Sequence, residues 1–173
     1  MKEHKGMRPQ DIVILLKLVI DAEQVTRIRD LSSKLFISQS EISESLNRST
    51  IAGLLEPVTR AVNRNGLLNF LEHGLQYVFP AQVGAVMQGV YTAHSEYSLY
   101  LSFSSAEKLV WADPKGKERG STIQPLYPTV TKAIKNDRLL YKLLALCDII
   151  RIGDTSDKHK AAWQLKEIFQ TQS

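Results

Sequence analysis

A serine beside a histidine is the pair in this sequence best suited to chemistry, because it could supply a nucleophile and its general base. His94 and Ser95 stand together in the phrase TAHS, and His73 lies on the other side of the glycine-rich centre, where the two histidines could meet. No G-x-S-x-G elbow, acidic partner at motif spacing or glycine-rich phosphate loop accompanies the pair. We therefore expect structural histidines and no enzyme.

Metal binding would require histidine, cysteine or carboxylate side chains at ligand spacing. The four histidines lack that spacing, and the single cysteine, Cys147, lies in the apolar run LLYKLLALCDII. A cysteine in such a run is by default a buried structural thiol. The sequence predicts no metal, nucleotide or redox cofactor.

Basic residues gather in the segment ADPKGKERG. Asp113-Pro114-Lys115-Gly116 is a good tight-turn sequence between extended flanks. Lys115, Lys117 and Arg119 would then lie at the tip of a β-hairpin. They could form a second phosphate contact or a surviving wing, but charged turns are usually only solvated, and we favour that interpretation.

Aromatic residues are frequent in the centre of the chain. They could line a ligand pocket between the two halves of the protein, or they could build the core of a small mixed domain. Both interpretations apply to Tyr91, Tyr97, Tyr100, Phe103, Trp111 and Tyr127.

Hydrophobic periodicity predicts the elements that position these residues. Pro9 suits the first turn of a helix, and Thr26 is a plausible N-cap of the next one. The predicted helices span residues 10–23, 26–35, 38–49, 64–78, 135–152 and 157–170. Between residues 80 and 128 the sequence predicts loops and short strands, with strands in SLYLSF and KLVW.

The third predicted helix begins with a capping box. Ser38 can accept a hydrogen bond from the amide of Glu41, whose carboxylate can reach back to the amide of Ser38. Gly53 is the natural terminator of this helix. Its apolar residues point to one side, and its predicted solvent-facing residues are Ser40, Ser43, Glu44, Asn47 and Arg48.

The predicted fold class is α+β and mainly α. We expect one domain at residues 1–79 and a mixed module at residues 80–173, with a short β-hairpin and closing helices. The helix at 135–152 is the most hydrophobic. With the first helix it could form a two-fold dimer interface, or an intramolecular core could bury the same face.

The run IRDLSSKLFISQSEISESLNRSTIAGLL resembles the winged helix-turn-helix regulators of bacteria, including the MarR type. The shared pattern is a leucine in the supporting helix, an "IS" turn, S-E-I-S at the start of the next helix and a glycine–leucine–leucine exit, and it covers roughly the first 78 residues. The phrases HGLQYVFP, TAHS, VWADPKGKERG and IQPLYP look like a family of uncharacterised bacterial proteins with such an N-terminus. That second resemblance implies no activity.

The resemblance implies that the third helix enters the major groove of double-stranded DNA. The side chains that would reach base edges or phosphates are Gln39, Ser40, Ser43, Asn47 and Arg48, and those that would hold phosphates are Arg27, Arg29, Lys34, Arg60 and Arg64. Glu41 and Glu44 depart from a DNA-reading face. The capping box can turn Glu41 towards its own backbone, whereas Glu44 must accept from cytosine or lower the affinity.

The bulk composition agrees with a polyanionic partner, because the net charge is +4. The first apolar stretch is too short and too charged to span a membrane, so we expect a cytoplasmic protein without a membrane partner. The function expected from the sequence is homodimeric, sequence-specific transcription regulation. The alternative is a protein-interaction module, such as an antitoxin-like or adaptor protein, that uses the same fold to hold a partner chain.

Overall fold

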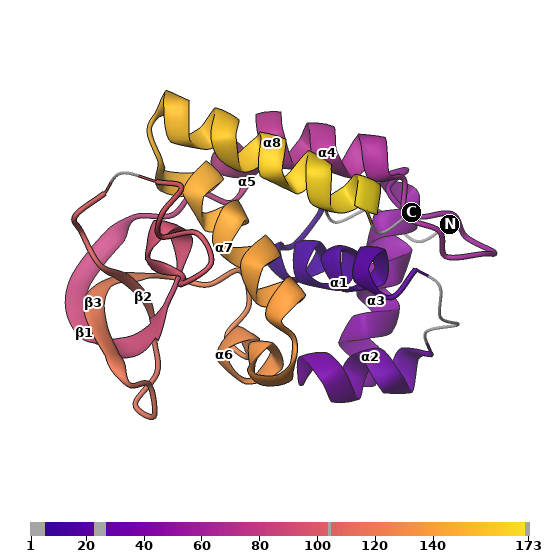
Figure 1. Ribbon diagram of the computed structural model, residues 1–173. Helices are drawn as coiled ribbons and strands as arrows, with labels where there is room; N and C mark the ends of the chain where they lie inside the picture. Colours follow the sequence, from indigo (N-terminus) through magenta and orange to yellow (C-terminus); the bar gives the residue numbers. More distant parts are fainter. Residues whose placement is uncertain (1–5, 23–26, 104, 172–173) are drawn as a thin grey trace.

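The molecule has helices at one end and a small three-stranded sheet at the other (Figure 1). The computed structural model describes residues 6–22, 27–103 and 105–171. In these ranges the helices are α1 Pro9–Ile20, α2 Ile28–Leu35, α3 Gln39–Ile51, α4 Arg64–His73, α5 Leu75–Val78, α6 Val130–Ala133, α7 Arg138–Ile152 and α8 Thr155–Thr171. The strands are β1 Val83–Tyr91, β2 Leu109–Ala112 and β3 Glu118–Ile123, and the 3-10 turns are η1 Ala93–Ser95 and η2 Ile134–Asn136. The expected mixed α+β class, mainly helical, is confirmed.

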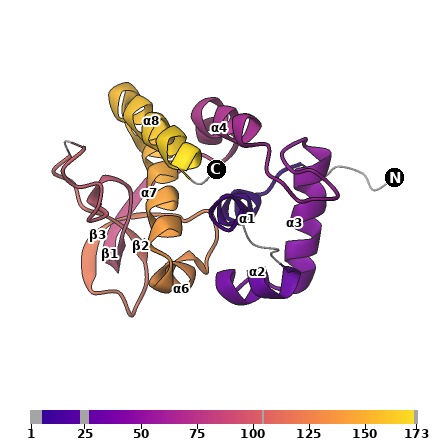
Figure 2. The same cartoon turned by 45° about the vertical axis from the view of Figure 1, so that its right-hand side comes forward.

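α1 forms the centre of the helical end. It contacts both α3 and α7, and Figure 2 shows it between them. Every residue from Asp11 to Val19 is buried, as expected for a helix with apolar residues on more than one side. Even Lys17 is buried, because its ammonium group finds two carboxylates inside the protein.

α2 and α3 follow with bounds close to the predicted ones. Thr26, the expected N-cap of α2, lies outside the described residues, and Arg27 occupies that position. Ser38 caps α3, which continues to Ile51 rather than ending at residue 49. Gly53 then adopts a left-handed conformation (φ 74°), and the amide of Leu54 donates back to the carbonyl of Ser49 at 3.0 Å. This bonding closes the end of the helix as glycine caps do.

The prediction of a single helix at residues 64–78 is wrong, because the segment is divided at Gly74 into α4 and α5. Gly74 has an extended φ of −111° for a residue in the right-handed helical region, and a Cβ there would lie 3.0 Å from the ring of Phe70. The break lets the two pieces contact different neighbours, α4 against α8 and α5 against α7. Figure 1 shows α4 and α8 side by side.

The prediction of a strand in SLYLSF is also wrong, whereas the predicted strand in KLVW is confirmed as β2. Leu99 and Phe103 are buried, but Leu101 between them is 95% exposed, so the alternation of apolar residues does not mark a buried face. The amides of Leu99 and Tyr100 both donate to the carbonyl of Glu96, which gives consecutive turns instead of a strand.

The expected hairpin of β2 and β3 is a further correction. The turn exists, since the amide of Gly116 donates to the carbonyl of Asp113 at 2.9 Å, but β2 and β3 pair in parallel. Both strands pair antiparallel with β1, which the sequence did not single out as a strand. The three strands close into a very small barrel.

Close backbone approaches at glycines allow this closure. A Cβ at Gly116 would lie 2.1 Å from the carbonyl oxygen of Gly89, and a Cβ at Gly89 would lie 2.1 Å from that of Trp111. No side chain fits at either distance, so the tight curve of the barrel depends on glycine there.

One continuous hydrophobic core joins the two expected domains. It runs from Ile12 and Leu31 through Leu67 to Trp111, Leu143 and Phe169. The surplus apolar residues Leu146 and Ile149 of α7 are fully buried within this chain, and α1 packs against α7. The face that could have formed a dimer interface is therefore covered intramolecularly.

None of the helices within the described ranges is both long and apolar enough to span a bilayer.

Candidate nucleic-acid interface

The turn between α2 and α3 sets the direction in which α3 projects. Leu35 and Ile37 are buried on either side of Phe36, which adopts a left-handed conformation (φ 56°). Ser38 follows, and its hydroxyl accepts from the amide of Glu41 at 3.2 Å. The two buried anchors and the cap together hold the first turn of α3.

One face of α3 is polar and open to solvent. Gln39, Ser40, Ser43 and Glu44 are exposed and Asn47 is half-buried. At 100° per residue these positions fall within one side of the helix, opposite the buried Ser45 and Ser49. Four of the five residues expected to reach base edges therefore share an accessible surface.

Arg48 is the fifth, and its expected place on the solvent-facing side is wrong. The residue is 6% exposed, and its guanidinium donates two hydrogen bonds to Asp11, from Nε to Oδ2 at 2.9 Å and from Nη2 to Oδ1 at 2.6 Å. These hydrogen bonds raise the pKa of Arg48 above its already high value, despite burial. Arg48 is thus the partner of a buried carboxylate, and it holds α3 to α1.

Glu41 completes this network rather than the capping box. Its carboxylate accepts from Arg48 at 2.5 Å and from Gln10 at 3.0 Å, and Arg8 lies 3.5 Å away. Burial raises the pKa of Glu41, but the hydrogen bonds from Arg48 and Gln10 outweigh burial and leave the pKa lowered. Of the capping box only the bond from the Glu41 amide to Ser38 forms among the described residues. The charge of Glu41 is therefore compensated beside α1, and Glu44 is the acid left on the open face.

The expected phosphate-holding cations are divided by the structure. Arg27 and Arg29 are exposed at the start of α2. Lys34 forms an ion pair with Asp21 at 2.8 Å, and Arg64 donates to the carbonyl of Phe169 at 2.6 Å on the far side of α4. Lys34 and Arg64 thus have structural contacts.

A short ordered loop follows α3. Leu55 and Val62 form an antiparallel bridge, and the carboxylate of Glu56 accepts from the amide of Val58 at 3.0 Å and from the hydroxyl of Thr59 at 2.6 Å. These hydrogen bonds hold the pKa of Glu56 below its usual value. Arg60, at the tip, takes a left-handed conformation (φ 58°). The loop lies in sequence where a wing would follow a recognition helix, but it is only one bridge long.

The serine and histidine of TAHS do not form a catalytic pair. Nε2 of His94 lies 2.7 Å from the carbonyl of Glu107, and the hydroxyl of Ser95 accepts from the amide of Leu109 at 2.9 Å. Both side chains thus tie η1 to the segment before β2. Throughout the part of the chain that the structure describes, no three His, Cys, Asp or Glu side chains gather as a metal site. Cys147 is buried, and burial raises the pKa of its thiol.

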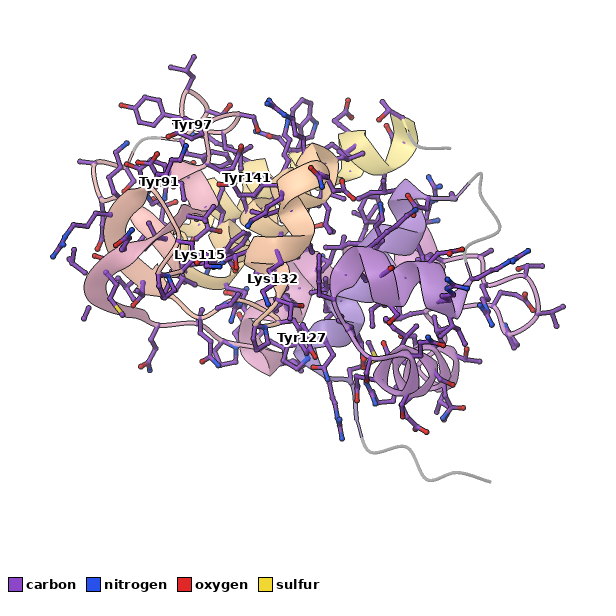
Figure 3. All side chains as sticks on the ribbon, turned by 90° about the horizontal axis from the view of Figure 1, so that it is seen from below. Tyr91, Tyr97, Lys115, Tyr127, Lys132 and Tyr141 are labelled. Atoms are coloured by element: carbon purple, nitrogen blue, oxygen red, sulfur yellow. The ribbon has the colours of Figure 1, made fainter. Side chains whose placement is uncertain are left out.

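Some of the central aromatic residues build the core, and Tyr97 lines a hollow that lies within the second half of the chain and not between the two halves. Trp111 and Phe103 are buried in the core. Tyr97 and Tyr141 instead line a hollow of about 640 Å³, and the hydroxyl of Tyr141 donates to the carbonyl of Tyr91. Figure 3 shows these three tyrosines near one another.

Asp148 is a buried acid that the sequence did not single out. It accepts from Trp111 Nε1 at 2.7 Å, from Thr92 at 2.8 Å and from Arg151 at 2.7 Å. Burial raises its pKa, although Arg151 and the hydrogen bonds oppose that shift. Trp111 of β2 links the cluster to the sheet, and Arg151 links it to the end of α5 by donating to the carbonyl of Phe79; its residues are buried.

Comparisons with protein-family models, with curated proteins and with solved structures find no match for this chain. Its own geometry therefore carries the functional inference.

Proposed function

We propose that the protein binds double-stranded DNA and acts as a sequence-specific transcription regulator, with α2 and α3 as a helix-turn-helix and the loop at residues 55–62 as a short wing. The exposed polar face at the start of α3 is the observation that carries this proposal. The N-terminal part of a recognition helix is the part that contacts base edges in the major groove.

The side chains on that face suit base recognition. Gln39 and Asn47 can each make paired hydrogen bonds with adenine, and Ser40 and Ser43 can bond to any base. Arg27 and Arg29, at the adjacent start of α2, would contact phosphates. The interactions of Glu41 with Arg48, Arg8 and Gln10 support the proposal, because they compensate the negative charge of one of the two glutamates that would repel DNA.

The test starts from duplexes selected out of a randomised pool, with affinity measured by fluorescence anisotropy over a range of salt concentrations. We expect affinity to fall steeply as salt rises. Gln39→Ala and Asn47→Ala should each weaken binding to the selected duplex by about ten-fold. Arg29→Ala should weaken binding to all duplexes alike and reduce the salt slope by about one.

Gln170→Ala is the matched control, since Gln170 is an exposed glutamine on α8, away from α3. It should leave affinity unchanged. Absence of saturable binding at low salt, or an equal loss in Gln170→Ala, would contradict the proposal.

A protein-interaction module is the second candidate. Ile51 at the end of α3 is 46% exposed and Val58 in the following loop is 87% exposed, and exposed apolar side chains of this kind suit a protein partner. If no duplex binds at any salt while Ile51→Ser abolishes a stable complex with a partner chain, this second function replaces the first.

The expected homodimer stays a prediction. Palindromic sites require a two-fold pair of reading helices, but α1 and α7 are already used within one chain. Light scattering of the free protein and of its DNA complex would show whether two copies bind together.

A further inference from the structure

A hollow of about 780 Å³ lies between the end of α2 and the second half of the chain. Lys17, Lys34 and Phe36 line it from the α1–α2 side, and Lys115, Lys132 and Lys135 line it from the sheet and α6 side. Figure 3 shows Lys115 and Lys132 close together where the β2–β3 turn meets α6. Its volume falls in the range typical of small-molecule sites, roughly 300–1,000 Å³.

The lining is strongly cationic. It holds five lysines and only two acids, Asp113 and Asp137. Lys17 lies 2.7 Å from Asp137 and 2.9 Å from Asp21, and Lys34 also contacts Asp21, so these two lysines are compensated. Within the described ranges, Lys115, Lys132 and Lys135 form no ion pair with any carboxylate, and all three are exposed. Asp113, in the same lining, is the acid whose charge acts on Lys115 and Lys135, so the hollow keeps an excess of positive charge, which favours an anionic ligand.

Phe36 adds an aromatic wall. It is a bulky residue in the left-handed conformation (φ 56°), where glycine or asparagine would be less strained. Its ring is 54% exposed, so the hydrophobic core does not use it fully. The left-handed conformation ends α2 as an αL C-cap, and it directs an exposed ring to the wall of the hollow, where the ring can contact a ligand.

We propose that this hollow binds a small polyanion that carries a flat ring, of the nucleotide class, with its phosphates held by Lys115, Lys132 and Lys135 and its ring against Phe36. Asp137 already accepts from Lys17 and from the amide of Leu140, and Asp113 accepts from the amide of Lys115, so the three lysines and Phe36 supply the ligand contacts. This site lies outside the proposed DNA-reading face and does not depend on it.

The experiment is calorimetric titration of the full chain with three probes: ATP, inorganic triphosphate and adenosine. ATP should bind most tightly, triphosphate more weakly and adenosine most weakly. The double variant Lys132→Ala/Lys135→Ala should weaken ATP and triphosphate binding by roughly ten-fold or more, because it removes two charge-assisted contacts. Phe36→Asn removes the ring but introduces asparagine, which tolerates the left-handed backbone conformation at this position. It should weaken ATP binding about five-fold or more while leaving triphosphate binding unchanged.

Lys160→Ala/Lys166→Ala is the matched control, since it removes the same charge from exposed positions on α8. Circular dichroism melts of all variants establish that each is folded. Equal losses in the two double variants would overturn the proposal, because binding would then follow net charge alone. It would also be overturned if Phe36→Asn left ATP binding unchanged, or if no probe bound while Lys132→Ala/Lys135→Ala weakened duplex DNA binding, since the hollow would then belong to a DNA-backbone surface.

Discussion

At the residue scale, the arginine and carboxylate network of α1 and α3 decides how α3 can be used. Asp11 is fully buried, accepts two hydrogen bonds from Arg48 and also accepts from the amide of Arg8 at 2.8 Å. An arginine with this environment cannot reach a nucleic acid without leaving a buried carboxylate unpaired. In the proposed DNA complex, the residues that would read bases are therefore those nearer Gln39 and Ser43.

Arg48→Ala should destabilise the protein by about 3–5 kcal/mol, because it leaves Asp11 as an uncompensated buried charge. Chemical denaturation followed by circular dichroism measures this change in the free energy of unfolding. Arg29→Ala is the control, since Arg29 is exposed and should change stability by less than about 0.5 kcal/mol. Equal stability of the two variants would show that Arg48 does not serve as the partner of Asp11.

At the element scale, the small barrel is set by close backbone approaches rather than by a hairpin turn. β1 pairs with β2 through Gly89 to Tyr91 and with β3 through Val83 to Gly89, so one curved strand serves both partners. Gly116 sits directly against the backbone of Gly89 where the two pairings meet.

Gly116→Ala should destabilise the fold by roughly 3 kcal/mol, because its Cβ would overlap a backbone carbonyl that cannot move alone. A thermal melt measures the effect. Gly84→Ala is the matched control in β1, where the added Cβ would meet the hydroxyl end of Thr122, which can rotate away. A melting temperature for Gly116→Ala as high as that of Gly84→Ala would show that the close approach of the Gly116 and Gly89 backbones does not determine stability.

At the scale of the whole molecule, an ion-pair chain joins the first two helices, α1 and α2, to α7. Lys17 on α1 bridges Asp21 and Asp137, Asp21 also binds Lys34 of α2, and Asp137 caps α7 by accepting from the amide of Leu140 at 2.9 Å. Burial lowers the pKa of Lys17, but the hydrogen bonds with Asp137 and Asp21 outweigh it and leave the pKa raised. The two halves expected from the sequence are thus joined by charge as well as by the shared core.

This chain of ion pairs predicts a pH dependence. Burial raises the pKa of Asp21, but the hydrogen bonds from Lys34 and Lys17 outweigh it, so the folded-state pKa lies below the ordinary value of an aspartate. A lowered carboxyl pKa contributes stability above the unfolded pKa, and that contribution is lost as pH falls through the folded pKa. Asp21→Asn should therefore cost about 3 kcal/mol near neutral pH, and the difference from wild type should shrink below about pH 4.

Urea denaturation at several pH values measures this difference. Asp30→Asn, at an exposed position of α2, is the control and should change the free energy of unfolding little at any pH. A difference for Asp21→Asn that stayed constant down to pH 2 would contradict the role assigned to Asp21.

Local patterns determined most of the helices. The spacing of apolar residues and the caps at Ser38 and Gly53 placed α1, α2, α3, α7 and α8 within a few residues, because these signals act over one or two turns of the chain. The open face of α3 near Gln39 and Ser43 followed from the same periodicity.

Only the tertiary structure decided the charges and the sheet. Arg48 is buried because it pairs with Asp11, which lies 37 residues earlier in the sequence. Lys17 pairs with Asp137, which lies 120 residues later. β1 is recognisable as a strand only from its pairing with its neighbours. The lysine-lined hollow likewise brings together α1, α2, the β2–β3 turn and α6. Periodicity indicates which side of an element is apolar, but partners this distant in sequence come into contact only in the folded chain. Whether an arginine is buried against a carboxylate or exposed and able to bind a phosphate depends on those contacts.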